Sequence, residues 1–166
     1  NSSLIGTAGF SSDGYEWFRI NGNVTLNTTN FGTRKVILFV ENGNLTINGT
    51  AGTLNLGAGL THTFTGTWTR TRGTLNGGSS VLRIGGNISG TGGTFTAGTG
   101  TVDYNRNTNQ TCAVVTYNNL TLSGTGTRTF ATTPTVNGVL SLEGTTTVTV
   151  TTGVISYGAA ATLQYN

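Results

Sequence analysis

The chain has 166 residues, of which 37 are Thr, 27 Gly and 18 Asn, while only 8% are charged and the formal net charge is +3. Thr, Gly and Asn are poor helix formers, so this composition excludes an ordinary helical domain. The longest apolar run, Val36 to Val40, is too short to span a membrane as a helix. The eight basic residues are scattered along the chain, which disfavours a nucleic-acid partner.

Residues 1–20 differ from everything that follows, because they contain little Thr and several aromatic residues. The aromatic residues of interest are Phe10, Tyr15, Trp17 and Phe18. Such a segment could close the end of a β domain, or it could dock onto a neighbouring subunit, and the sequence leaves both readings open. We therefore divide the chain into an N-terminal cap or docking segment, 1–20, and a β domain, 21–166.

Short segments of the β domain alternate between apolar and hydroxyl side chains. Val24 to Leu26, Leu45 to Ile47, Leu120 to Leu122 and Leu140 to Leu142 all read apolar–hydroxyl–apolar. In a strand, this period of two places the apolar side chains on one face and the hydroxyl on the other. Asn-Gly pairs between these segments supply the residues that tight corners favour.

Thr occupies every second position from Thr61 to Thr71. Rows of Thr hydroxyls on a flat sheet can bind ice, and aromatic rings can stack on sugars. The candidate residues for an ice-binding or glycan-binding surface are Thr61, Thr63, Thr65, Thr67, Trp68 and Thr69.

The segments recur at intervals near 20 residues. The sequence that starts at Gly22 returns at Gly43, and Leu120 to Leu122 returns as Leu140 to Leu142. A longer segment from Gly49 returns at Gly90, about two intervals later. A unit of this size cannot bury its own apolar face, whereas stacked copies can share one core. We therefore expect an all-β fold, a β-helix of about eight coils; the alternative is an antiparallel β-sandwich, which would use the same composition.

The segment from Tyr117 to Phe130, followed by Thr135 to Gly144, resembles the repeats of large secreted bacterial β-solenoid proteins, and Gly93 to Tyr104 resembles the same repeats. These proteins include filamentous-haemagglutinin-like and autotransporter-passenger-like adhesins. The resemblance covers roughly residues 43–166. It implies a right-handed parallel β-helix, export and a role at the cell surface, and it supplies no catalytic residues.

Groups that carry chemistry are scarce. Asp103 and Glu143, about two coils apart, are the one pair of acids that a stack could bring together for acid–base catalysis. Cys112 is the only Cys and His62 the only His, so we expect neither a disulfide, a metal site nor a catalytic dyad. Eight Asn-x-Ser/Thr sequons are a mild excess over chance and are weak evidence of glycosylation.

The last residues, 161–166, contain no charge and no Pro to protect an open strand edge. Leu163 and Tyr165 therefore join Phe10, Tyr15, Trp17 and Phe18 as candidate docking residues. We expect a non-enzymatic, extracellular structural protein without a cofactor, either an adhesin segment or a filament subunit whose copies stack end to end. The alternative is a glycan-binding or ice-binding module. The expected partners are further copies of the chain and surface glycans.

Overall fold

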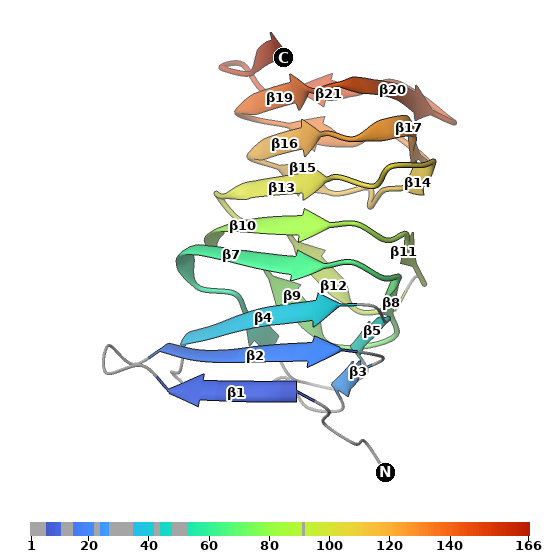
Figure 1. Cartoon of the computed structure of the whole chain (residues 1–166). Coiled ribbons are helices and arrows are strands. Elements are labelled where there is room, and N and C mark those ends of the chain that lie inside the picture. The colour runs from blue at the N-terminus through green and yellow to red at the C-terminus, as the bar shows by residue number, and fades with distance from the viewer. Residues whose placement is uncertain are drawn as a thin grey trace.

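The computed structural model describes residues 6–10, 15–21, 24–26, 35–41, 44–47, 53–90 and 92–166, with side-chain burial mainly from residue 56 onward. The described residues form strands joined by turns, without a helix. The strands stack as a β-solenoid, and the two termini lie at opposite ends of the stack (Figure 1). Among the described residues, no helix has the length and hydropathy needed to cross a bilayer.

One sheet runs the whole height of the stack (Figure 1), and we call it the front sheet. Its strands follow one another from bottom to top as β1 (Gly6–Phe10), β2 (Tyr15–Asn21), β4 (Lys35–Glu41), β7 (Ala58–Phe64), β10 (Ser79–Ile84), β13 (Thr101–Tyr104), β16 (Asn119–Leu122), β19 (Val139–Leu142) and β22 (Thr162–Tyr165). Every neighbouring pair is parallel except β1 and β2, which are antiparallel. The parallel ladder excludes the antiparallel sandwich.

The second and third faces of each turn form shorter sheets. The second face contains β3 (Val24–Leu26), β5 (Leu45–Ile47), β8 (Trp68–Arg70) and β11 (Ile88–Ser89), then separately β14 (Gln110–Thr111), β17 (Thr125–Phe130) and β20 (Thr145–Val150). The third contains β6 (Thr53–Asn55), β9 (Thr74–Asn76) and β12 (Thr94–Thr96), then β15 (Thr116–Tyr117), β18 (Thr135–Val136) and β21 (Ser156–Tyr157). Both faces are therefore interrupted at the same height, between residues 96 and 110.

The repeat interval is confirmed, but the number of coils is corrected. Val24 pairs with Leu45 and Leu120 with Leu140, as the sequence repeats predict. The solenoid has about five turns rather than eight. From Ala58 to Tyr157, five turns carry a strand on all three faces. Division of the whole length by 20 counted as coils both the antiparallel strand β1 and the terminal strand β22, neither of which makes a complete turn.

Apolar side chains stack in columns inside the turns. In the front sheet, Leu82, Val102, Leu120 and Leu140 lie in register on successive strands, and each is at most 1% exposed. Burial of one such side chain contributes about 1.5–3 kcal/mol, so these columns supply the main driving force for stacking. Outward positions between them carry Thr, Ser, Asp and Arg.

Close stacking at the corners depends on Gly and Asn. A Cβ atom on Gly86 would overlap the backbone carbonyl of Gly66 in the turn below, so only Gly fits this corner. Four Asn side chains accept a hydrogen bond from a backbone N–H one turn further along the chain: Asn44 from Thr67, Asn87 from Thr111, Asn109 from Thr127 and Asn119 from Val139, at 2.9–3.0 Å. All four belong to the Asn-x-Ser/Thr motifs, so these motifs have a structural use in joining turns.

Candidate functional site

The C-terminal end of the front sheet exposes positions that are buried elsewhere. In the last parallel pair, Leu163 lies opposite Leu140 and Tyr165 opposite Leu142. Leu140 is 1% exposed, whereas Leu163 is 49% and Tyr165 is 71% exposed. Paired residues of a parallel ladder point to the same side, so Leu163 and Tyr165 continue the inward columns without a further turn above them.

The other two sheets end in the same way. Tyr157 of β21 lies opposite Val136, which is fully buried, yet Tyr157 is 51% exposed, and Val154 beside it is 72% exposed. An open groove of about 360 Å³ runs along this end of the stack. We call this surface the C-terminal face and define it by Val148, Val150, Val154, Ile155, Tyr157, Leu163 and Tyr165.

The edges that border the C-terminal face are unprotected. β20, β21 and β22 are each the last strand of their sheet, so their outer backbone N–H and C=O groups have no neighbouring strand in the described chain. Natural edge strands usually carry charge or Pro, which prevents pairing with another chain. After Glu143 the sequence contains no Asp, Glu, Lys, Arg, His or Pro. The end of the solenoid therefore combines three open edges with an uncharged apolar surface.

The candidate docking residues lie at the two opposite ends of the stack. Leu163 and Tyr165 belong to the C-terminal face. Phe10 lies on β1, and Tyr15, Trp17 and Phe18 lie on β2, at the N-terminal end (Figure 1); the surroundings of these four side chains lie outside the described residues. One molecule does not bring the two sets together, but two molecules stacked end to end would.

The predicted Thr surface is divided between two faces. Thr61 and Thr63 lie on the outer side of β7, Thr65 and Thr67 lie at the corner, and Thr69 lies on β8. Trp68 is corrected: it is only 1% exposed and packs edge-on against Phe95, with 4.9 Å between ring centroids. A ring in the core cannot stack on a sugar, so Trp68 does not belong to a glycan surface.

A more regular hydroxyl array lies higher in the stack, where the sequence analysis did not place it. Thr125, Thr127 and Thr129 of β17 pair in register with Thr145, Thr147 and Thr149 of β20. The hydroxyls of Thr127 and Thr147 are 2.9 Å apart and hydrogen-bonded. The signal was present in the sequence, because two Thr-x-Thr-x-Thr segments are separated by 20 residues, one repeat interval.

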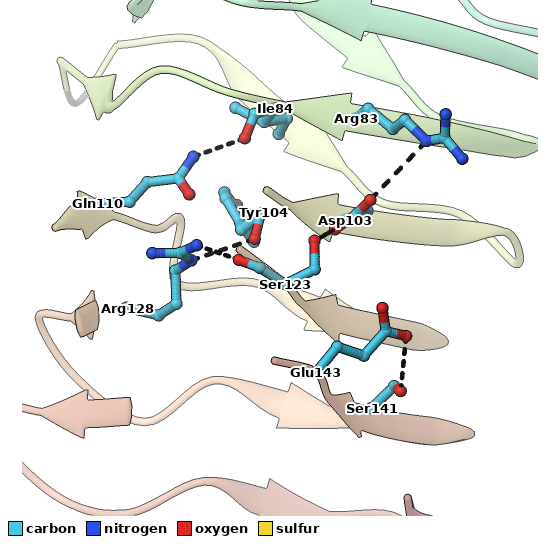
Figure 2. A network of polar contacts seen from close by, with 9 residues as sticks. All are labelled: Arg83, Ile84, Asp103, Tyr104, Gln110, Ser123, Arg128, Ser141 and Glu143. Carbon is cyan, nitrogen blue, oxygen red and sulfur yellow. Dashed lines mark hydrogen bonds and ion pairs between the residues drawn. The ribbon is translucent and has the colours of Figure 1, made fainter. Parts of the chain in front are cut away.

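The acids Asp103 and Glu143 belong to a polar track on the outer side of the front sheet (Figure 2). Ser123 donates a hydrogen bond to Asp103 at 2.7 Å, Arg83 lies 3.8 Å from the same carboxylate, and Ser141 donates to Glu143 at 3.0 Å. Burial raises the pKa of Asp103, the Ser123 bond and Arg83 oppose the rise, and Glu143 adds to it. The two carboxylates are thus close enough to interact electrostatically, and each is bound to a neighbouring hydroxyl.

Polar side chains bind the backbone where the second and third faces are interrupted, a region that we call the junction. Gln110 is 2% exposed, and its Nε2 donates to the carbonyls of Ile84 and Gly86 at 2.6 and 2.7 Å. The Gln110 Oε1 accepts from the backbone N–H of Arg106 at 3.3 Å. Gln110 therefore satisfies backbone groups of two turns at the height where the ladder stops.

Arg128 is the second polar side chain of the junction and is fully buried (Figure 2). Its guanidinium donates to five backbone carbonyls, which belong to Tyr104, Arg106, Thr108, Ser123 and Thr125. Three of these lie in or beside the loop after β13, which makes the 18-residue step from Gln110 to its partner Arg128 in β17. A guanidinium with its fixed fork of N–H donors can bind several carbonyls at once, so Arg128 holds this loop against the core.

Cys112 and His62 are both interior residues. Burial strongly raises the pKa of the Cys112 thiol, which disfavours the nucleophilic thiolate. His62 is fully buried, donates to or accepts from the carbonyl region of Leu56 through Nε2 at 2.9 Å, and burial lowers its pKa. Since a carbonyl only accepts, Nε2 carries the proton. Among the described residues, no group of three His, Cys, Asp or Glu side chains could hold a metal ion.

Comparison with protein-family models, curated proteins and solved structures yields no match for this chain. The resemblance to secreted adhesin repeats therefore stays a prediction. The functional argument depends on the geometry of the solenoid itself, and above all on the C-terminal face.

Proposed function

We propose that this chain is a non-enzymatic, extracellular structural β-solenoid, a surface adhesin segment or filament subunit that stacks end to end with further copies. The observation that carries the proposal is the C-terminal face. Three strand edges end there together, and the inward columns of the core continue onto it as Val154, Tyr157, Leu163 and Tyr165, which are 49–72% exposed.

The partner at this face is the N-terminal end of another copy. The front sheet reaches both ends of the stack, so β22 of one copy can extend the ladder onto β1 of the next. Contact between two different ends of the same molecule is heterologous and leaves both outer ends free, which produces open filaments rather than closed dimers. The uncharged residues after Glu143 add no electrostatic repulsion to this contact.

Electron microscopy and sedimentation velocity of the native chain test the proposal. We expect particles that lengthen with protein concentration. Val154→Asp should abolish them, because the ordered stack would bury a charge without a partner. Val114→Asp is the matched control, since Val114 is also an exposed apolar residue, 37% exposed, but lies outside the C-terminal face. A strictly monomeric chain at all concentrations, or a closed dimer as the largest species, would contradict end-to-end stacking.

The hydroxyl array on β17 and β20 favours a second candidate, an ice-binding or glycan-binding face. Thr147 and Thr149 are exposed, and the backbone ladder keeps their hydroxyls in a fixed grid with those of β17. Thermal hysteresis of the purified chain would support ice binding, and retention on a glycan array would support the glycan. If neither is observed, the array serves only to join the two turns.

A further inference from the structure

Two buried N–H groups on β8 have no hydrogen-bond acceptor: Nε1 of Trp68 and Nε of Arg70. The two residues are two positions apart on one strand, so their side chains leave the same face of the sheet, toward the interior. Trp68 is 1% exposed. Buried polar groups in native proteins are almost always paired, so two unpaired donors side by side indicate that an acceptor binds between them.

A narrow pocket of about 150 Å³ adjoins both residues at the corner between β8 and β9. It is lined by Trp68, Arg70, Arg72, Gly73, Leu75, Gly93 and Thr94. Gly93 has a φ of +68°, and a Cβ atom there would lie 2.8 Å from the carbonyl oxygens of Arg72 and Gly73. Because Gly73 and Gly93 lack side chains, the corner leaves space beside the two donors that no protein atom fills.

The charge of the lining selects the ligand. Two guanidinium groups, those of Arg70 and Arg72, line the pocket, and no carboxylate does. Arg70 forms no hydrogen bond or ion pair with the described residues, whereas Arg128, the other inward-facing Arg, has five carbonyl acceptors. A buried cation without a partner is costly, and an anion that accepts from Arg70 and Trp68 would remove that cost.

We propose that the pocket at the β8–β9 corner binds a small monovalent anion, a halide or a carboxylate of the size of formate. Trp68 and Arg70 donate to it from inside, and Arg72 closes the site from outside. The space admits no water-sized sphere with the side chains as they stand, so the exposed Arg72 side chain moves aside when the ion enters. The bound ion would link the turn that contains β8 to the next turn, which contributes Gly93 and Thr94.

The indole N–H signal of Trp68 in a ¹H–¹⁵N spectrum reports on the site directly. The chain has two Trp residues, so Trp17→Phe assigns the signals. Sodium chloride and sodium formate are titrated separately at constant ionic strength, with gluconate, an anion too large for the pocket, as the balancing ion. We expect a saturable shift of the Trp68 signal with at least one of the two ions, an unchanged Trp17 signal, and a parallel rise in the unfolding temperature.

Arg70→Met should weaken the apparent affinity about tenfold or more, because it removes a charged hydrogen bond. Arg83→Met is the matched control, since it removes the same charge from the outer side of the front sheet. If Arg70→Met does not fold, Arg72→Met provides the same comparison at an exposed position. Shifts that are linear and equal for both Trp signals, shifts that Arg70→Met and Arg72→Met leave intact, or no shift with either ion would overturn the proposal.

Discussion

The β-ladder of this solenoid stops at two places, and it stops differently at each. At the junction between residues 96 and 110, the second and third faces are interrupted inside the stack, and Gln110 and Arg128 bind the backbone carbonyls there. At the C-terminal face, all three sheets end together, and apolar side chains such as Val154 and Tyr157 are exposed instead.

The difference shows what an interrupted ladder requires in each setting. Inside the stack water is excluded, so carbonyls that lose their strand partner need a side-chain donor, and a buried Arg or Gln is worth its desolvation cost. At the end of the stack the backbone edge is open to solvent, and no such side chain is needed. An internal interruption is therefore closed by the sequence itself, while the terminal one is left able to pair with another strand.

The largest expected effect comes from Arg128→Met, which keeps the length of the side chain but removes all five hydrogen bonds. We expect the free energy of unfolding to fall by about 3–5 kcal/mol, because several carbonyls would be left buried without a donor. Urea denaturation measures this, and Arg83→Met on the outer surface should change stability by at most about 1 kcal/mol. A loss below about 1 kcal/mol for Arg128→Met would mean that the junction is no more dependent on side chains than the open end.

Gln110→Leu should have a smaller effect on the same junction. The substitution keeps a similar volume and removes two N–H donors from the carbonyls of Ile84 and Gly86. We expect a loss of about 1–3 kcal/mol in the urea midpoint analysis. Gln164→Leu is the control, because Gln164 lies on the last strand, is exposed and bonds only to Asn166 among the contacts found for it. Equal effects of the two substitutions would remove the distinction between the junction and the end.

Much of this fold was predictable from the period of the sequence. Offsets of 20 and 21 residues predicted the pairing of Leu120 with Leu140 and of Val24 with Leu45, because identical segments in register bury the same face. The junction was not predicted. Its 18-residue step, from Gln110 to Arg128, is close to the common interval, and the residue types of the loop do not say that the neighbouring ladders are interrupted.

The alternation of side chains contained more information than the sequence analysis used. Trp68 lies between Thr67 and Thr69, so a strand that presents those hydroxyls outward must direct Trp68 inward, as the structure shows. The same rule places Arg128, between Thr127 and Thr129, on the side of Phe130. The C-terminal docking pair, Leu163 and Tyr165, was predicted from the lack of charge alone, and the register supplies the reason: both continue core columns.

The smallest expected effect separates the interior from the C-terminal face by pH. Burial lowers the pKa of His62 from its usual value of 6.5, so below that pH the unfolded chain binds a proton more readily than the folded chain does. Stability should therefore fall as the pH is lowered from 7 through 6.5 and toward the folded pKa of His62. Asp103, whose pKa is raised from 3.8, acts in the opposite direction, because its ionisation costs stability as the pH rises above 3.8.

A comparison with His62→Gln isolates the histidine, since Asp103 is present in both chains. Urea denaturation at a series of pH values should show a steeper loss on acidification for the native chain than for the variant, and parallel curves would contradict the assignment. End-to-end association should respond differently. No Asp, Glu, His, Lys or Arg follows Glu143, so the C-terminal face has none of the side chains that change charge between pH 5 and 8. Association measured by sedimentation at fixed protein concentration should then stay constant over the range in which the stability of the folded chain declines.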